Sequence, residues 1–326
     1  MNLSSGLAAM TPLGYGAANV GNLYREVSDE QAHAVLQAVW DSGVRYFDTA
    51  PHYGLGLSER RLGAFLATKP REEFVVSTKV GRLLVPQPNP DGSLDLEADF
   101  AVPADLRREW DFTRAGIERS VEESLQRLGL DSVDVIYLHD PERHDLDRDL
   151  ESGLAAAAAL RDAGVVQAIG VGSMTTAALA AAAGTGLVDL LMVAGRYTLL
   201  DRSAAAVLDT CAERGIGVVV ASVFNSGLLA VDELGPDARY EYGPVPPELR
   251  RRHHELAARC RQYGIALAAA ALQFGMRHPA TRSVVVGTAR AHQFRANAAA
   301  FAADIPAEFW AELVREDVRA ADSYMV

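Results

Sequence analysis

Short apolar runs rich in valine and isoleucine alternate with longer amphipathic stretches along most of the chain. Several runs are almost continuous in apolar residues, which is typical of parallel strands that are covered on both faces. Eight strands that alternate with helices, with no Pro/Gly-rich linker between them, predict one α/β domain over residues 1–326, folded as a (β/α)8 TIM barrel. The predicted strands are residues 12–16, 44–48, 74–79, 133–139, 168–172, 189–194, 217–222 and 283–287.

The stretches between these runs carry helix signals. After the first strand, Ser28 and Gln31 have the spacing of a capping box, in which each side chain accepts a hydrogen bond from the backbone N–H of the other residue. Apolar residues then recur on one face as far as Trp40, and Gly43 can adopt the left-handed conformation that often ends a helix. The alternative fold is a doubly wound open sheet, but no G-x-G-x-x-G opens a helix after a strand, which favours the barrel.

Two long segments interrupt the alternation. Residues 81–112 follow the third strand and are rich in proline, aspartate and glycine, and loops of that length are usually functional or disordered. Because the segment emerges beside Lys79, we expect it to cover the substrate side of the barrel mouth; a disordered insertion is the alternative. Residues 231–247 form a second long insertion, after the seventh strand.

Charge and composition narrow the class of protein. The net charge is −12 and the isoelectric point is about 5.1, so the surface repels phosphate backbones, and neither nucleic acid nor an anionic membrane is expected as a partner. Cys211 and Cys260 fall in predicted helices outside any C-x-x-C pair, and we expect reduced thiols without a metal or catalytic role. Residues 1–12 show no secretory signal, and no apolar window is long enough to span a bilayer. These features predict a cytoplasmic enzyme with a small-molecule substrate, either a monomer or a small homo-oligomer.

Ionisable residues end three successive predicted strands. Asp48, Lys79 and His139 lie at the carboxyl ends, where TIM barrels place their catalytic groups, and Tyr53 follows Asp48 by five residues. Each residue alone has a structural explanation: a turn cap, a surface lysine, a core histidine or a packing tyrosine. Their joint occurrence at the correct ends of successive strands favours a catalytic site.

This combination suits proton transfer. A phenol has an ordinary pKa of about 10 and is a poor base at neutral pH, but a neighbouring ammonium such as that of Lys79 favours the phenolate. Asp48 can hold the lysine, and His139 can donate a hydrogen bond to a substrate oxygen. Tyr53 is therefore predicted to exchange a proton with a carbonyl or hydroxyl oxygen.

The sequence segments around these residues resemble those of the aldo-keto reductase family. The run from Phe47 to Gly54 is similar to the family's opening signature, and Lys79 and His139 match its two remaining catalytic positions. The similarity extends from about Leu13 to Asn297. It implies an Asp48, Tyr53, Lys79 and His139 tetrad and a nicotinamide dinucleotide, NAD or NADP, bound across the barrel mouth.

The resemblance also implies the residues that contact the cofactor. Gly16 and Ala17 match positions near the nicotinamide ribose, and Tyr197 matches an aromatic residue that stacks on the nicotinamide. The matches to the pyrophosphate loop are Ser222, Phe224, Asn225 and Gly227, and those to the adenosine end are Gly287, Thr288, Gln293 and Asn297.

The chain departs from the family pattern where the carboxamide is held. It has Gly172-Ser173 in place of the common Ser-Asn, and Ala194 in place of Gln, so either Ser173 or Arg196 is expected to contact the carboxamide. NADPH-specific relatives carry cations at the positions of Gly287 and Gln293, which predicts a preference for NAD.

Within the family, three sequence segments resemble one branch: the residues after His139, residues 168–174 and residues 194–200. This branch contains sugar 1-dehydrogenases acting on L-fucose or D-threo-aldoses, together with pyridoxal 4-dehydrogenase. That branch implies oxidation of a cyclic hemiacetal to a lactone, with His52 and Trp110 as expected substrate contacts. The alternatives are an NADPH-dependent carbonyl reductase, a Schiff-base aldolase that uses Lys79, and a non-catalytic binding protein on the same scaffold.

Overall fold

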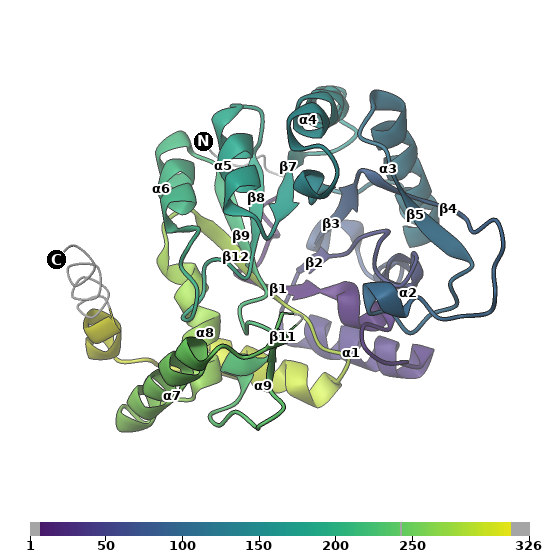
Figure 1. Ribbon diagram of the computed structural model, residues 1–326. Coiled ribbons are helices and arrows are strands. Elements are labelled where there is room, and N and C mark those ends of the chain that lie inside the picture. The colour runs from purple at the N-terminus through teal and green to yellow at the C-terminus, as the bar shows by residue number, and fades with distance from the viewer. Residues whose placement is uncertain (1–6, 242, 314–326) are drawn as a thin grey trace.

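The computed structural model describes residues 7–241 and 243–313. Eight parallel strands close into a barrel in the order β1-β12-β9-β8-β7-β6-β3-β2, with helices around it, so the (β/α)8 prediction is confirmed (Figure 1). Each predicted strand is present, with ends that differ by at most two residues from the predicted ones. The barrel strands are β1 (Leu13–Gly16), β2 (Tyr46–Asp48), β3 (Val75–Val80), β6 (Val135–His139), β7 (Ala168–Ser173), β8 (Leu190–Ala194), β9 (Gly217–Ala221) and β12 (Thr281–Val286).

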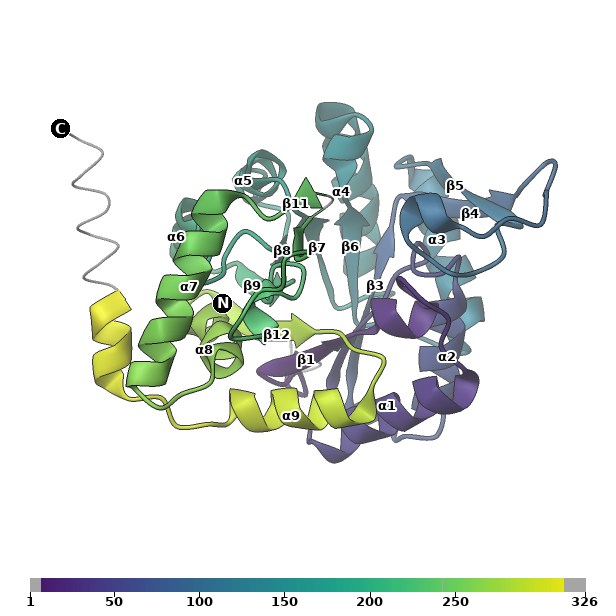
Figure 2. The same cartoon turned by 60° about the horizontal axis from the view of Figure 1, so that its bottom comes forward.

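The first helix forms as its sequence predicts. Ser28 and Gln31 make both bonds of the capping box, and Gly43 follows the helix with φ of 82°. Figure 2 shows the helices from a second side, with α9 and α1 next to each other below the strands. The helices are α1 (Asp29–Asp41), α2 (Leu57–Leu66), α3 (Arg114–Leu128), α4 (Leu146–Asp162), α5 (Thr176–Gly184), α6 (Ala205–Arg214), α7 (Pro247–Gln262), α8 (Leu267–Phe274) and α9 (Ala291–Phe301).

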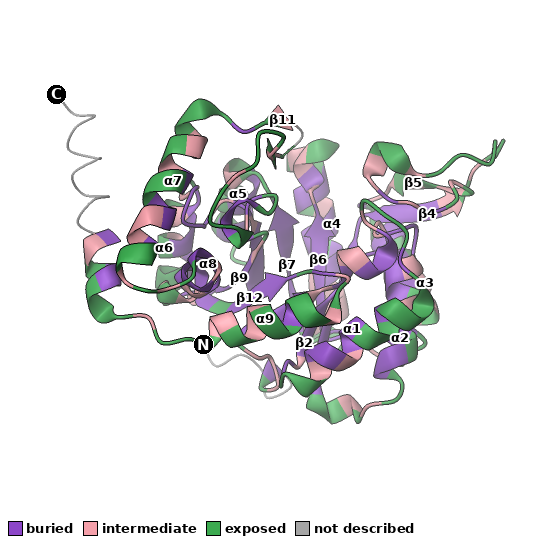
Figure 3. Cartoon of the chain, turned by 90° about the horizontal axis from the view of Figure 1, so that it is seen from below, coloured by how far each residue is buried: buried purple, intermediate pink, exposed green. Residues whose placement is uncertain are grey.

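The core has two layers because side chains alternate between the two faces of each strand. One buried cluster fills the barrel interior and includes Tyr46, Val75, Tyr137 and Met192. The larger cluster lies between the strands and the helices. Figure 3 shows the buried strands enclosed by helices whose outer faces are exposed.

The two long segments are not structureless loops. The ends of segment 81–112 pair as an antiparallel hairpin, β4 (Arg82–Pro86) with β5 (Leu106–Trp110), in a register that joins Arg82 to Trp110. The disordered alternative for this segment is therefore wrong. In segment 231–247, β10 (Arg239–Tyr240) and β11 (Gly243–Pro244) form a shorter hairpin.

Both cysteines lie in helices, as predicted. Cys211 and Cys260 are buried free thiols in α6 and α7. Within residues 7–241 and 243–313, no helix has the length and apolar character needed to cross a membrane. The prediction that residues 1–12 contain no secretory signal falls partly on residues 1–6, which lie outside the described residues.

Helices α2 and α3 approach each other closely at a glycine. A Cβ atom on Gly63 would lie 1.9 Å from the carbonyl oxygen of Leu128, a distance that requires the backbone to shift. Gly184, the last residue of α5, has no atom within 4 Å of its Cβ position. The two sites therefore allow a matched comparison of the same substitution.

We expect Gly63→Ala to destabilise the protein, by about 1–3 kcal/mol as for other overpacked sites. The control Gly184→Ala should be neutral or stabilising by up to about 1 kcal/mol, because it removes backbone freedom from the unfolded chain without a clash. Urea unfolding of the two variants and the wild type measures both effects. Equal stability of the two variants would contradict the proposed helix contact.

Candidate active site

Three of the four predicted catalytic side chains point into the barrel interior, because residues two apart on a strand share one face. Asp48 follows inward-facing Tyr46 by two residues, and His139 follows inward-facing Tyr137 in the same way. Lys79 is the penultimate residue of β3. Asp48, Lys79 and His139 are all buried, and they lie at the same end of three neighbouring strands.

Tyr53 reaches this group from the turn that follows β2. The turn packs against the 3-10 helix at Ala17–Gly21, where a Cβ on Gly54 would lie 2.1 Å from the carbonyl oxygen of Gly21. Gly54 also has φ of 60°, which glycine adopts without steric cost. The Tyr53 ring is then 6.0 Å from the His139 ring, measured between centroids, and 4.7 Å from the Lys79 Nζ. The structure thus brings the predicted tetrad together.

A buried ion pair fixes the lysine. Lys79 Nζ donates to Asp48 Oδ2 at 2.6 Å and to the carbonyl oxygen of Thr49 at 3.0 Å, and the Ser77 hydroxyl donates to Asp48 Oδ1 at 2.7 Å. Burial opposes the charge on Lys79, but the Asp48 carboxylate and Tyr53 outweigh it and raise the pKa of Lys79. Lys79 therefore stays an ammonium beneath Tyr53.

Burial and charge act in opposite directions on the tyrosine. Burial raises the pKa of Tyr53, while the charge of Lys79 and its hydrogen bonding lower it. The net direction is upward, with Asp48 and Asp140 adding to the rise. The predicted effect of Lys79 is present, but it offsets the burial of the phenol only in part.

The two histidines of the site are uncharged. Burial, together with the charges of Arg82 and Lys79, holds the pKa of His139 well below its usual range. Burial and the charge of Arg108 lower the pKa of His52 to about 2. His52 lies next to His139, with ring centroids 5.5 Å apart, and the Nδ1 atom of each is buried without a hydrogen-bond partner. A neutral His139 carries one N–H that can donate to a substrate oxygen.

Segment 81–112 covers this side of the mouth. Phe100 packs on both the Tyr53 ring and the His52 ring, at centroid distances of 6.2 and 5.5 Å. Arg108 donates to the carbonyl oxygen of His52 at 3.0 Å. The Trp110 ring stacks on His144 and on Phe112, with centroid distances of 5.8 and 6.0 Å, and its contact with substrate stays a prediction.

Several polar residues near the tetrad were not singled out by the sequence analysis. Arg82 forms an ion pair with Asp140, the residue that follows His139. Glu142 accepts a hydrogen bond from the Ser173 hydroxyl. One sequence signal could have found them: Arg82 and Asp140 flank catalytic strand ends, three residues after Lys79 and one after His139.

The loop after β9, which the sequence analysis predicts to contact the pyrophosphate, contains several residues in the left-handed conformation. Ser222, Asn225 and Gly227 all have positive φ, at 55°, 45° and 88°, and such turns present backbone N–H groups in a concave arrangement. Asn225 donates to the carbonyl oxygen of Gly195, and its own Oδ1 is buried without a partner. Phe224 lies half-buried in this loop. A contact of this loop with the cofactor's pyrophosphate stays a prediction.

The residues predicted to contact the adenosine end of the cofactor lie after β12. Thr288 donates its hydroxyl to Gln293 at 2.7 Å, and Tyr15 donates to the carbonyl oxygen of Thr288 at 2.8 Å. Gly287 and Gln293 are exposed, and Asn297 lies further along α9. Gly16 and Ala17, at the end of β1, are next to this loop.

The expected nicotinamide contacts have other neighbours in the structure. The Tyr197 residue is 9% exposed, and its ring packs against Phe274 and His278. Arg196 forms ion pairs with Asp201 and Glu241. The Ser173 hydroxyl is bound to Glu142, as stated above. Roles of Tyr197, Ser173 and Arg196 toward the cofactor stay predictions.

Comparison with known proteins agrees with this geometry. The model of the aldo/keto reductase family matches residues 12–316. The chain belongs to the aldo/keto reductase family. It is accordingly an oxidoreductase that acts on a small molecule with a nicotinamide cofactor.

Two curated family members span nearly the whole chain. A D-threo-aldose 1-dehydrogenase of a Pseudomonas species is 60% identical over 94% of this chain and 93% of its own length. A pyridoxal 4-dehydrogenase of Microbacterium luteolum is 38% identical over 94% of both chains. Among solved structures, an aldo-keto reductase of Bacillus halodurans in its holo form has a TM-score of 0.72 at 22% identity, covering 93% of this chain and 91% of that one, which shows the fold.

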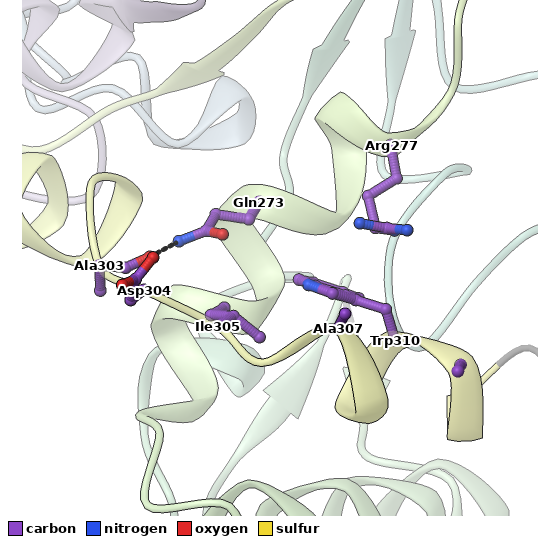
Figure 4. Close-up of a pocket in the computed structure, with 8 residues that line it drawn as sticks. Gln273, Arg277, Ala303, Asp304, Ile305, Ala307 and Trp310 are labelled. Atoms are coloured by element: carbon purple, nitrogen blue, oxygen red, sulfur yellow. Dashed lines mark hydrogen bonds between the residues drawn. The ribbon is translucent and has the colours of Figure 1, made fainter.

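A surface cavity lies away from the family's catalytic residues. It has a volume of about 680 Å³, and Figure 4 shows the Gln273 and Arg277 side chains on one wall and Trp310 on another. The Arg277 guanidinium lies 4.7 Å from the Trp310 ring centroid. No member of the tetrad lines this cavity, so we assign it no part in the reaction.

We expect the uncharged state of His52 to make stability depend on pH. The unfolded chain takes up a proton on His52 as the pH falls through about 6.5, whereas the folded protein, with a pKa of about 2, does not. Lowering the pH from about 7 to about 5 therefore favours unfolding, by at most about 2 kcal/mol from this residue.

Urea unfolding of His52→Asn at the two pH values tests this expectation. The loss of stability between them should be smaller than in the wild type. His254→Asn, at an exposed position of α7, is the control and should leave the loss unchanged. An equal loss in all three proteins would contradict the neutral His52.

Proposed function

We propose that this family member is a sugar 1-dehydrogenase: it oxidises the anomeric C–OH of a cyclic hemiacetal to a lactone, with NAD as the preferred acceptor. The observation that carries the proposal is the 60% identity to a D-threo-aldose 1-dehydrogenase over nearly the full length of both chains. The similarity to a pyridoxal 4-dehydrogenase supports the same chemistry, because pyridoxal also forms a cyclic hemiacetal.

The tetrad geometry supports a role for each side chain. Tyr53, as phenolate, takes the proton of the anomeric hydroxyl, and the Lys79 ammonium 4.7 Å from its ring stabilises that phenolate. Neutral His139 donates its N–H to the same substrate oxygen and orients it. The bound cofactor supplies the acceptor for the hydride that leaves the anomeric carbon. Asp48 holds Lys79 in place through their ion pair.

Unpartnered polar atoms on the substrate side favour a polyhydroxylated substrate. His52 Nδ1, His139 Nδ1 and Glu142 Oε2 are all buried without a hydrogen-bond partner. Buried polar groups almost always have partners, and an unsatisfied one costs about 1–3 kcal/mol. Sugar hydroxyls can both donate to the acceptors among these atoms and accept from a donor, whereas the carbonyl oxygen of a simple aldehyde can only accept.

Three further expectations accompany the proposal. The protein acts in the cytoplasm as a monomer or small homo-oligomer, and it has no nucleic-acid partner. Segment 81–112 covers the substrate and not the cofactor, since Phe100 lies on Tyr53 and His52. Two other classes were considered. An aldolase on Lys79 would leave Tyr53 and the dinucleotide-like residues unexplained, and the intact tetrad argues against a purely structural binding protein.

We expect oxidation of L-fucose, D-arabinose, L-galactose or pyridoxal when each is incubated with NAD⁺ or NADP⁺, followed at the nicotinamide absorbance band. Tyr53→Phe should lower kcat at least about a hundredfold, the usual contribution of a general acid/base, and should leave dinucleotide binding intact. No turnover with any member of the panel, together with rapid NADPH-dependent reduction of simple aldehydes, would favour a carbonyl reductase instead. Near-normal turnover of Tyr53→Phe would exclude the proposed role of Tyr53.

The adenosine end supports a preference for NAD. An NADP-specific site needs cations near the 2′-phosphate. A Cβ on Gly287 would lie 2.6 Å from Asn19 Oδ1 and 2.8 Å from the carbonyl oxygen of Gly16, so this position has no room for a cationic side chain. Gln293 is uncharged and is bound to Thr288. Arg290, at the N-terminus of α9, is exposed.

We therefore expect kcat/KM for NAD⁺ to exceed that for NADP⁺ severalfold with one substrate. Arg290 can turn toward a 2′-phosphate, so Arg290→Ala should increase this ratio further. The exposed Arg295 of the same helix gives a matched control, and Arg295→Ala should change the ratio less. A ratio below one in the wild type would contradict the proposed preference.

A further inference from the structure

Arg82 is a buried arginine whose charge acts on His139, the predicted catalytic histidine. Arg82, the first residue of β4, is 4% exposed. One of its terminal nitrogens donates to Asp140 Oδ2, and its guanidinium lies 4.4 Å from the Trp110 ring centroid across the hairpin. A charge is expensive to bury unless it is paired, so the pair of Arg82 and Asp140 calls for an explanation.

The partner of this arginine lies within reach of His139. Asp140 Oδ2, the atom that accepts from Arg82, is 3.8 Å from His139 Nε2, which is too long for a hydrogen bond. The Asp140 backbone is fixed by a bond from its N–H to the carbonyl oxygen of Gly172 at 3.0 Å and by a positive φ of 46°. A shift of less than 1 Å in the carboxylate would therefore place it on the imidazole.

We propose that Arg82 is a positioning residue that holds the Asp140 carboxylate away from His139, so that His139 keeps an uncharged ring whose N–H is directed to the substrate oxygen. The consequence for catalysis depends on the proposed function, whereas the state of the His139 ring does not. Without Arg82, the carboxylate would accept the His139 N–H and stabilise an imidazolium, as a carboxylate beside a histidine does.

The other groups around His139 act in the same direction as Arg82. Lys79, His52 and Arg143 all disfavour a proton on the His139 ring, and Arg82 acts more strongly than any of these three. Asp140 is the acidic group nearest to the ring, at 3.8 Å, and Glu142 lies beside Asp140. The Tyr53 ring meets the His139 ring edge to face. Burial is the largest cause of the low pKa of His139, and Arg82 adds to it both through its own charge and by holding the nearby Asp140 carboxylate.

Arg143 allows Arg82 to be tested against a matched residue. Both arginines affect the pKa of His139 and of Asp140, but Arg143 is exposed in the 3-10 helix at Pro141–Arg143. Its backbone N–H donates to the Asp140 carbonyl oxygen at 3.0 Å, whereas its side chain makes no hydrogen bond or ion pair with Asp140 among the described residues. If general positive charge were enough, the two should contribute alike. If the direct bond matters, only Arg82 should.

The experiment is a pH titration of the ¹⁵N-labelled histidine ring by NMR in the ligand-free protein, with the His139 signals identified by their loss in His139→Asn. In the wild type and in Arg143→Met, the His139 ring should stay neutral from about pH 5 to about pH 9. In Arg82→Met it should titrate within that range. The double variant Arg82→Met/Asp140→Asn should restore a ring that does not titrate, because the released carboxylate is gone.

Steady-state kinetics, with whichever compound of the substrate panel the enzyme oxidises, give the second measurement. Arg82→Met should lower kcat at least about tenfold with a smaller change in KM, and adding Asp140→Asn should recover most of kcat. A His139 ring that stays neutral in Arg82→Met would overturn the proposal, even if activity falls. A raised KM that Asp140→Asn does not rescue would also overturn it and would make Arg82 a substrate ligand. If Arg82→Met does not fold, Asp140→Glu should move a carboxylate toward His139 and raise its pKa; no change would count against the proposal.

Discussion

The buried ion pair between Lys79 and Asp48 is the interaction on which the site depends. Its side chains are 3% and 4% exposed, and the two charges are 2.6 Å apart. Desolvating such a pair is unfavourable unless the remaining donors and acceptors are satisfied. Here the Ser77 hydroxyl and the Thr49 carbonyl oxygen supply the missing bonds. The barrel thus keeps a permanent positive charge below the Tyr53 phenol in a place that water does not reach.

The surrounding architecture follows from keeping that charge in position. Strand alternation turns Asp48, Lys79 and His139 inward, while the intervening residues fill the layer beneath the helices. Tyr53 cannot come from a strand, because it must lie above the lysine, and a turn with a left-handed glycine brings it there. The strands therefore carry the charged side chains, and a tightly packed turn carries Tyr53, the proposed acid/base.

The sequence was sufficient to predict the barrel and the tetrad because both depend on local rules. The ends of β2, β3 and β6 follow from apolar runs, and TIM barrels place their catalytic residues at such ends. The order in segment 81–112 could not be predicted, because the pairing of Arg82 with Trp110 joins residues that are far apart in the chain. The contact of Arg82 with Asp140 is also non-local. The surroundings of Tyr197 depend on where α8 packs, which periodicity does not specify.

The hairpin has a consequence for how such enzymes diversify. Its two ends, Arg82 and Trp110, lie side by side in the β4–β5 register, so the intervening chain leaves and re-enters the barrel at almost one point. A segment with adjacent ends can be lengthened, shortened or exchanged without altering the path of the strands. The hairpin can therefore change in length or shape as a module without moving Asp48, Lys79 or His139 on their strands.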